Sequence, residues 1–490
     1  MTPPGMIKRD DDEDGARELT SSSYVASSGR KRHFVLSSSR TAVLACCVWI
    51  CTLVGESYPS LARLRWVVVL LLVWMFLRRV RLLALVGISC LVGIVGGASA
   101  WNVPVTLLTT ECSGVAVLRS DPQPQFSGTR VVLELDGQRY IAQSYGGPSR
   151  RLAQRSAGES VVIRGTCSPL QGNFVRADRV RHIVGRLSVE YVSESFGEGN
   201  AVLRAANRMR TSMNDGVAPM SHDTRSLFMG LVVGDDRLQP RDMVQRFRNS
   251  GLSHLCAASG QNVAYLLALA SPVLKRRSPR MRWLITLCII GWFVVLTRGE
   301  PSVLRAGWMA AAVATNALRR TPMNARTVLS LSVVCLLLID PMLAWSIGFA
   351  LSVGATAGLA WLSAPFGRIV GGRGVLASTL AAQVGTVPVS LAVFGSVPVV
   401  SLVTNPLALP VAGAVMTVGL PLSLLASTLP PLQGVVSGGL SVPVVWVDTV
   451  ARLGSALSPH GALNTALWAV VVMWVALRWN RVHRLTSVAG

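Results

Sequence analysis

The sequence is poor in charged residues, and acidic side chains and lysines are the scarcest of them. Only 14% of its 490 residues are charged, whereas soluble globular proteins carry about 25%. This difference excludes an ordinary soluble enzyme and a disordered chain. The 24 acidic residues face 47 basic ones, for a net charge of +23, and only three basic residues are lysines. The others are arginines, which bind phosphate bidentately, although a GC-rich genome also favours arginine over lysine.

Groups that could hold a metal ion or a nucleotide are also missing. The six histidines are isolated from one another, and the glycine-rich segment 371–374 lacks the lysine and the hydroxyl of a phosphate-binding loop. The apolar segments contain no nucleophile motif and no paired carboxylates. We therefore expect no cofactor, no metal site and no enzymatic activity, and we expect the energy for any transport to come from elsewhere.

Apolar sequence is abundant: 51% of the residues are hydrophobic. Residues 1–40 are polar and are expected to form a disordered cytoplasmic tail. Apolar stretches at about 41–56, 64–77 and 80–101 then approach the length of about 20 residues that crosses a bilayer, so 41–101 is expected to hold three transmembrane helices. Arginines alternate between the two ends of these stretches, which predicts a cytoplasmic N-terminus and an extracytoplasmic residue 102.

The hydropathy falls between 102 and 195, and the pattern of residues becomes typical of strands. Turn signals separate short runs of β-forming residues, which predict five strands. These runs are 115–118, 129–136, 139–144, 161–165 and 174–180. Five short strands suggest a small β-barrel of the oligonucleotide- and oligosaccharide-binding (OB) type on the extracytoplasmic side.

Arginines and aromatic residues are interleaved in this β domain. A single-stranded nucleic acid needs cations for its phosphates and rings for its bases. The candidate nucleic-acid contacts are Arg139, Tyr140, Arg164, Phe174 and Arg176. A purely structural or assembly role for the domain is the alternative, because small barrels also bury aromatic residues.

Two of the nine cysteines, Cys112 and Cys167, fall in this β domain, whereas the other seven lie in or beside apolar segments. Buried cysteines in apolar segments usually act as small hydrophobic residues. Oxidation is permitted outside the cytoplasmic membrane. We therefore expect a disulfide between Cys112 and Cys167.

The C-terminal half is again largely apolar. Residues 196–250 predict amphipathic interfacial helices, 251–478 a helical transmembrane domain, and 479–490 a cytoplasmic tail. The prolines between 396 and 460 predict broken or re-entrant segments. The apolar stretches in this half are 251–273, 283–297, 302–318, 327–341, 343–363, 375–395, 399–427 and 463–477. The fold class expected is a polytopic α-helical membrane protein, with about 10–12 membrane segments and the β domain inserted.

Several separated motifs occur in a fixed order along this second half. They lie at 228–235, 250–263, 301–306, 340–352, 383–388, 394–395 and 405–406. With these motifs the sequence resembles the ComEC family of competence proteins, which are proposed to pass transforming DNA through the bacterial cytoplasmic membrane. The resemblance covers about 40–480, because three spans, a small barrel and a channel region are also the layout of that family.

The sequence departs from the family pattern at two points. Many relatives have a Leu-His pair where this chain has Gln261 and Asn262, so histidine chemistry cannot occur there. Full-length relatives often carry a metallo-β-lactamase-like domain, which needs a cluster of histidines to bind metal. No such cluster occurs here, so we expect a form of the family without this domain, and a separate protein as the nuclease.

Polar side chains in the motifs are candidates for a channel lining. Polar groups in apolar helices face the bundle interior or a wet cavity, or they act as hydrogen-bonded contacts between helices. Asn405 precedes a proline in a segment expected to be broken, and Arg305 needs a partner or a phosphate. The candidates that line the channel or contact DNA are His254, Ser259, Gln261, Asn262, Arg305 and Asn405.

The resemblance implies translocation of single-stranded DNA during natural competence, by a multi-pass protein of the cell membrane. The partners implied are single-stranded DNA, membrane lipids, an extracytoplasmic DNA receptor, and a cytoplasmic motor or single-strand-binding protein. The alternatives are a transporter of a small molecule or lipid-linked saccharide, a polytopic enzyme, and a family remnant that transports nothing.

Overall fold

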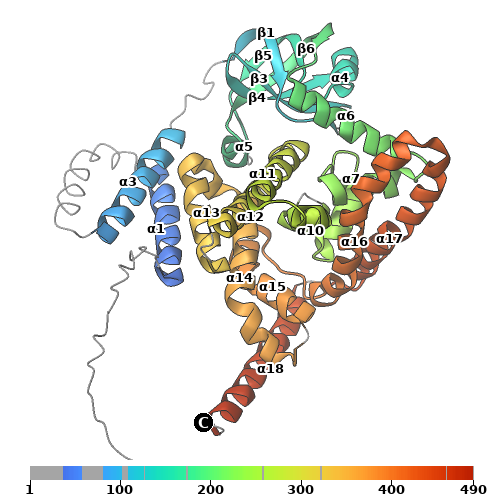
Figure 1. Ribbon diagram of the computed structural model, residues 1–490. Helices are drawn as coiled ribbons and strands as arrows, with labels where there is room; N and C mark the ends of the chain where they lie inside the picture. The colour runs from blue at the N-terminus through green and yellow to red at the C-terminus, as the bar shows by residue number, and fades with distance from the viewer. Residues whose placement is uncertain are drawn as a thin grey trace, which may run out of the picture. The chain divides into compact units, whose positions relative to one another are not determined.

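The structure is a computed structural model, and its described residues are 37–57, 81–101, 109–125, 127–172, 175–256, 259–319, 323–372, 374–459 and 461–488 (Figure 1). Most of the expected N-terminal tail, the apolar stretch 64–77 and Phe174 lie outside these residues. The part described is mainly helical, with one β domain.

The first two described helices, α1 (Ser38–Ser57) and α3 (Arg81–Trp101), pack closely through glycine. A Cβ atom on Gly55 would lie 2.3 Å from the carbonyl oxygen of Ile94, and one on Gly97 would lie 2.3 Å from that of Thr52. Small residues allow this close approach of membrane helices. Side chains of α1 join a hydrophobic cluster with α13 (Ala325–Ile339).

The β domain contains six strands whose pairings form a cycle. Strand β1 pairs with both β3 and β5, β3 pairs with β4, and β6 joins β4 to β5. The β4–β6 pair is parallel, and the other pairs in the cycle are antiparallel. The strands are β1 (Thr110–Leu118), β2 (Gln123–Gln125), β3 (Gly128–Leu135), β4 (Gln138–Tyr145), β5 (Ser160–Ser168) and β6 (Ile183–Gly197).

The expected fifth strand at 174–180 is wrong. Residues Val175–Val180 form the short helix α5, and the strand β6 follows it. Asp178 of α5 is buried and pairs with Arg130 at 3.6 Å, a contact between distant segments that local β propensity cannot reveal. The inward residues of β6, such as Leu187 and Val189, join the core of the domain. A second helix, α4 (Gly146–Ala153), was also not expected.

Four helices connect the β domain to the second apolar region. They are α6 (Ala201–Gly216), α7 (His222–Val233), α8 (Arg241–Asn249) and the single turn α9 (Ser253–Cys256). Every residue of α7 from Ser226 to Val233 is buried in the main hydrophobic cluster or beside it. This segment therefore lies inside the helical core, whereas the sequence suggested an interfacial position for it.

The second apolar region consists of long helices. They are α10 (Gly260–Lys275), α11 (Pro279–Leu296), α12 (Pro301–Arg319), α13, α14 (Ile347–Ile369), α15 (Gly374–Phe394), α16 (Ser401–Thr428), α17 (Pro430–Ala456) and α18 (Ala462–Val488), with the 3₁₀ helix η2 (Pro341–Trp345) after α13. Within the described residues, seven helices are long and apolar enough to cross a membrane, and two more apolar helices are shorter.

The segments expected to be broken or re-entrant between 396 and 460 form two long helices instead. Helix α16 is continuous over 28 residues although it contains Pro406, Pro410 and Pro421. A membrane helix tolerates proline where neighbouring groups satisfy the freed backbone. Pairing with α17 and α6 encloses much of α16: Gly216 of α6 lies so close that a Cβ atom there would meet the carbonyl of Ser423 at 1.9 Å.

The structure joins Cys112 and Cys167 in a disulfide between β1 and β5, with the two Cα atoms 5.8 Å apart. The cysteines are separated by 55 positions. A disulfide that closes a loop of this length stabilises the folded state by about 4 kcal/mol, because it lowers the conformational entropy of the unfolded chain. We expect the variant with serine at both positions to lose up to about that much stability of the β domain.

Alkylation of the protein after denaturation without reductant, followed by mass spectrometry, checks the bond. Both residues should stay unmodified until a reductant is added, whereas Cys335 should react in either case. Modification of Cys112 and Cys167 without reductant would contradict the prediction.

Candidate functional site

The polar residues at the start of α10 form a group of two separate hydrogen-bonded pairs. The hydroxyl of Ser259 donates to Asn262 Oδ1 at 2.9 Å, and Gln261 Nε2 donates to the hydroxyl of Tyr265 at 2.6 Å. Gln261 is exposed at the protein surface, whereas Asn262 is only 4% exposed. His254 lies on α9 just before this group, and it is also exposed.

Asn262 binds the end of another helix. Its Nδ2 atom donates to the carbonyl oxygen of Leu231 at 3.0 Å and to that of Val232 at 3.4 Å. Both carbonyls belong to the last turn of α7, which has no partner for them within its own helix. In this conformation Asn262 therefore connects α7 to α10, and Gln261 is the amide that faces outward.

Arg305 lies on α12 against the start of α10. It is 6% exposed, and its Nη2 atom would be 2.9 Å from a Cβ atom on Gly260. Its Nε atom donates to the hydroxyl of Ser352 at 2.9 Å, and its Nη1 atom contacts the sulfur of Met309 at 3.0 Å. Among the residues described, no carboxylate lies within ion-pair distance of it.

The position of Arg305 is electrostatically unusual. A helix N-terminus carries a partial positive charge, and the guanidinium lies beside the N-terminus of α10, whose cap residue Ser259 makes no capping hydrogen bond. Two positive features thus meet without an anion between them. An unpaired buried charge is costly, so this arrangement favours an anionic ligand.

Asn405 is buried on α16, away from the group at the start of α10. The Oδ1 atom of Asn405 has no hydrogen-bond partner within the described chain. The same is true of the Oε1 atom of Gln383 on α15. Gln383 Nε2 donates to the hydroxyl of Ser401. Gly413 of α16 lies against the side chain of Tyr265. Asn405 is about 12 Å from Gly413 along the axis of the same helix.

The expected DNA contacts of the β domain occupy different environments. Arg139 pairs with Glu134 at 3.4 Å, and Tyr140 belongs to the hydrophobic core, so its ring is not free to stack on a base. Arg164 and Arg176 are exposed, and each lies over an aromatic ring: Tyr191 for Arg164 and Trp101 for Arg176. Phe174 lies outside the described residues.

Two exposed aromatic side chains of β6 were missed from the sequence. Tyr191 is 47% exposed and Phe196 is 46% exposed. Phe196 lies under the guanidinium of Arg155, 3.8 Å from the ring centroid. The two residues are five positions apart, so strand alternation alone would place them on opposite faces. Both are exposed in a strand whose pairing with β5 contains register shifts.

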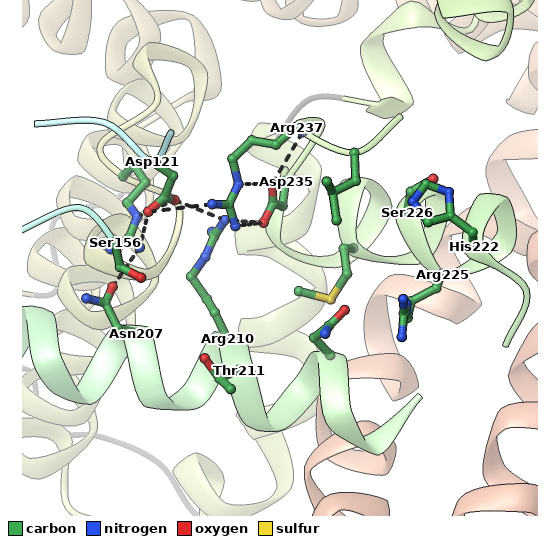
Figure 2. A pocket seen from close by; sticks show the side chains of 14 residues that line it. Asp121, Ser156, Asn207, Arg210, Thr211, His222, Arg225, Ser226, Asp235 and Arg237 are labelled. Atoms are coloured by element: carbon green, nitrogen blue, oxygen red, sulfur yellow. Dashed lines mark hydrogen bonds and ion pairs between the residues drawn. The ribbon is translucent and has the colours of Figure 1, made fainter. Parts of the chain in front are cut away.

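A buried group of ion pairs joins the β domain to three segments of the helical region (Figure 2). Arg298 donates to Asp121 from Nε at 3.0 Å and from Nη2 at 2.8 Å. Arg237 donates to Asp235 from Nε at 2.7 Å and from Nη2 at 2.6 Å. Arg210 Nη2 lies 2.6 Å from Asp235 and 3.4 Å from Asp121, so it connects the two pairs.

Neutral groups complete this network. Asn207 accepts from Arg298 Nη2 at 2.7 Å and donates to the carbonyl of Ala157 at 3.1 Å. Arg210 Nη1 donates to the carbonyl of Leu296 at the end of α11, 2.9 Å away. Arg298 therefore pairs with a carboxylate that lies 177 positions away in the chain.

The two carboxylates of the network are held in their charged form. Burial alone would raise the pKa of Asp121, but the charges of Arg237, Arg298 and Arg210 outweigh burial and lower the pKa below its ordinary value. For Asp235, burial again opposes ionisation, and the hydrogen bonds from Arg237 with the charge of Arg210 lower the pKa. The network therefore stays ionised at any pH near neutrality.

A second ion-pair group lies between α8 and α17. Asp448 is largely buried and accepts from Arg246 at 3.1 Å and from Arg452 at 2.6 Å. Asp340 caps the 3₁₀ helix η2, because its side chain accepts from the backbone N–H of Met342 at 3.0 Å. Within the described chain, no group of three or more histidine, cysteine or acidic side chains could hold a metal ion.

The network borders a cavity of about 160 Å³. One side is formed by the ion pairs, and the other side by His222, Arg225 and Ser226 of α7 (Figure 2). A second, larger cavity of about 430 Å³ lies between α10, α11 and α12 and is lined mainly by apolar side chains.

The family model described as "Competence protein" matches residues 231–484. This range is more than half of the chain, and it contains α9, α10 and Arg305. The chain belongs to the ComEC competence-protein family. It is a multi-pass membrane protein, as the seven long apolar helices found within the described residues indicate.

A relative of this family member is ComE operon protein 3 of Bacillus subtilis (strain 168), which is 30% identical over 175 residues. The alignment covers 35% of this chain and 23% of the relative. The chain therefore matches about a quarter of the length of that relative. No solved structure matches the chain.

The ion-pair network predicts that Asp121→Asn destabilises the joint between the β domain and the helices. Removing one partner of a buried ion pair costs about 3–5 kcal/mol. Because the carboxyl pKa is lowered in the folded state, the stabilisation is present above the unfolded pKa of about 3.9 and disappears only at lower pH. The loss should therefore be similar at about pH 5 and about pH 8.

Hydrogen exchange at Ala157, whose backbone N–H donates to Asp121 at 2.9 Å, together with the melting temperature, measures this effect. Asp136→Asn is the matched control, because Asp136 is exposed in the turn between β3 and β4. Equal melting temperatures and equal exchange at Ala157 in the two variants would contradict the prediction.

Proposed function

We propose that this protein carries single-stranded DNA across the cytoplasmic membrane during natural competence, as a channel without its own nuclease. Membership of the ComEC family supports DNA as the substrate, and the single observation that carries the proposal for this chain is Arg305. It is a buried cation without a carboxylate among the described residues, beside the polar start of α10, inside the region that the family model matches. Such a place suits a phosphate.

The scarcity of charge in the membrane segments fits passage better than tight binding. A strand carries one negative charge per nucleotide, and many arginines along its path would hold it. Few intramembrane charges, with neutral polar groups such as Gln261 and His254 along the path, would attract the strand without retaining it. Ser259, Asn262 and Asn405 would then position these groups or line the path in another conformation.

The β domain is proposed to be an extracytoplasmic OB-type barrel. The closed cycle of five strands, with one parallel pair between β4 and β6, supports this type. Tyr191 with Arg164, and Phe196 with Arg155, are the exposed aromatic and cationic pairs that a single strand could use. Arg176 beside Trp101 would extend this set, and Arg139 would contribute less because Glu134 neutralises it.

The proposal includes the orientation and the partners that the sequence suggested. The N-terminus would be cytoplasmic, and a receptor outside the membrane would deliver DNA. A cytoplasmic motor or single-strand-binding protein would supply the driving force for translocation. A separate nuclease would degrade the other strand. These partners follow from the chemistry of a passive path, which neither hydrolyses a nucleotide nor cleaves DNA.

One observation favours a second candidate function. The apolar cavity between α10, α11 and α12 has Lys275 and Arg282 at one end. An apolar groove with cations at its end would suit a lipid-linked saccharide or another amphipathic anion. A strain without the protein separates the two functions: a channel for DNA predicts normal growth with loss of transformation, and a lipid-linked substrate predicts an envelope defect.

Substituting Arg305 by methionine tests the channel directly. The change removes a charge that has no carboxylate partner among the described residues, so stability should be unchanged or higher. A hydrogen bond to a charged group contributes about 1.5–3 kcal/mol, so DNA uptake should fall about tenfold or more. Transformation frequency, uptake of labelled strand and the melting temperature of the purified protein are the measurements.

Arg319→Met is the matched control, because Arg319 is exposed at the end of the same helix. It should keep most of the uptake. Wild-type uptake by Arg305→Met in a fully inserted protein would remove Arg305 from the path. Loss of uptake together with loss of folding would assign it a structural role instead.

A further inference from the structure

The cavity beside the buried ion pairs is built from separate parts of the chain. The loop after β1, helix α6, helix α7, the loop before α8 and the loop between α11 and α12 all contribute. Its side chains are mostly polar, with Met229 and Leu238 as the apolar exceptions. A wall of this kind suits a small polar or charged ligand rather than an acyl chain.

The charges of the cavity wall do not balance. Four arginines line the cavity, whereas Asp121 and Asp235 are the only acidic side chains among its lining residues. The arginines are Arg210, Arg225, Arg237 and Arg298. The lining thus carries an excess of two positive charges even before His222 is counted. Positive charge enclosed in a partly buried site is stabilised by a bound anion.

Two arginines retain unused hydrogen-bond donors. Arg298 Nη1 is buried and has no partner in the part of the chain that the structure describes, although Nε and Nη2 of the same side chain are bonded. Arg225 is half-buried and has no ion pair with any described carboxylate. Guanidinium donors bind phosphate oxygens with good geometry. The cavity therefore has both the charge and the donors for an oxyanion.

The cavity is large enough for this ligand and open to solvent. Its volume of about 160 Å³ is many times the roughly 10–15 Å³ that a cavity needs to hold one water molecule. His222 and Leu238 of its lining are exposed, Leu238 by 51%, so an anion can enter on their side. Arg225 lies across the cavity from the ion-pair network (Figure 2).

We propose that this cavity binds a phosphate group of a single-stranded nucleic acid. Arg225 meets the phosphate from the α7 side, and the unused Nη1 donor of Arg298 meets it from the ion-pair side. This proposal deepens the proposed function, on which it rests, by adding a binding site between the β domain and the helices. Asp121 keeps Arg298 in position, so the ion-pair side of the site is preformed before the strand arrives.

Binding of labelled oligothymidylate to the full-length protein tests the site. The protein is placed in nanodiscs of zwitterionic phosphatidylcholine, and fluorescence anisotropy is measured over a series of salt concentrations. Arg225→Gln should weaken binding severalfold. Because each neutralised phosphate of a single strand contributes about 0.7 to the slope of log K against log salt concentration, that slope should decrease by about 0.7.

Arg208→Gln is the matched control. Arg208 is exposed on α6 and does not line the cavity, so this variant loses the same charge and should keep the wild-type slope. Equal slopes and affinities for Arg225→Gln and Arg208→Gln would overturn the proposal. Both variants should elute as the wild-type protein does, and Arg225→Gln is not expected to unfold because Arg225 is outside the ion-pair network.

Two further arms distinguish the source of the phosphate. Inorganic phosphate should raise the melting temperature of the wild-type protein more than that of Arg225→Gln. Nanodiscs with phosphatidylglycerol should leave the Arg225-dependent binding of oligothymidylate in place. Two results together would show that the cavity holds a lipid headgroup and that the nucleic-acid site is wrong. In phosphatidylglycerol nanodiscs, Arg225→Gln would bind oligothymidylate as the wild-type protein does. Phosphatidylglycerol, and not inorganic phosphate, would raise the melting temperature of the wild-type protein above that of Arg225→Gln.

Failure of this site and failure of the proposed function give different results. If the wild-type protein binds the strand and supports uptake while Arg225→Gln behaves in the same way, only the cavity is excluded. If a strain without the protein takes up DNA normally and the wild-type protein binds no strand, the proposed function is wrong as well.

Discussion

The cost of removing a charge from water organises this protein more than any other interaction. A charge buried without a partner is strongly destabilising, and the chain places very few charges in its apolar helices. Most of the buried charges that the structure describes lie against charges of the opposite sign. Asp448 lies between two arginines, and the carboxylates of Asp121 and Asp235 are enclosed by guanidinium groups. Arg305 differs from these, because the described residues provide it with no carboxylate.

This contrast separates structural charges from functional ones. The network around Asp121 is multiply bonded and connects the β domain to the helices, so it fixes the two regions together. Arg305 has no carboxylate among the described residues, and Arg298 beside the cavity near α7 keeps one buried donor without a partner there. A site that binds a phosphate briefly needs such donors, because a guanidinium whose N–H groups are all hydrogen-bonded within the protein cannot donate to a passing strand.

Local patterns in the sequence predicted much of the fold but little of the contact geometry. Apolar stretches gave the membrane helices, and alternating residues gave most strands, because both signals are local. The strand expected at 174–180 and the broken helices between 396 and 460 were wrong, since a buried Asp178 and the packing around α16 override local propensity.

Some of the candidate functional residues could likewise be predicted from local motifs, and others could not. The motifs located Arg305 and Gln261, which the structure brings to one place. The network of Asp121 with Arg298 could not be predicted, because its members come from segments 177 positions apart and each alone reads as an exposed loop charge.

Photo-crosslinking in living cells tests the central claim that a DNA strand passes beside the start of α10. A photoreactive amino acid at position 261 is compared with one at position 442, where Val442 on α17 is 72% exposed. During uptake of labelled DNA, light should link the strand to position 261 and not to position 442. Equal linking at both positions, or none at position 261 in cells that are taking up DNA, would contradict the account.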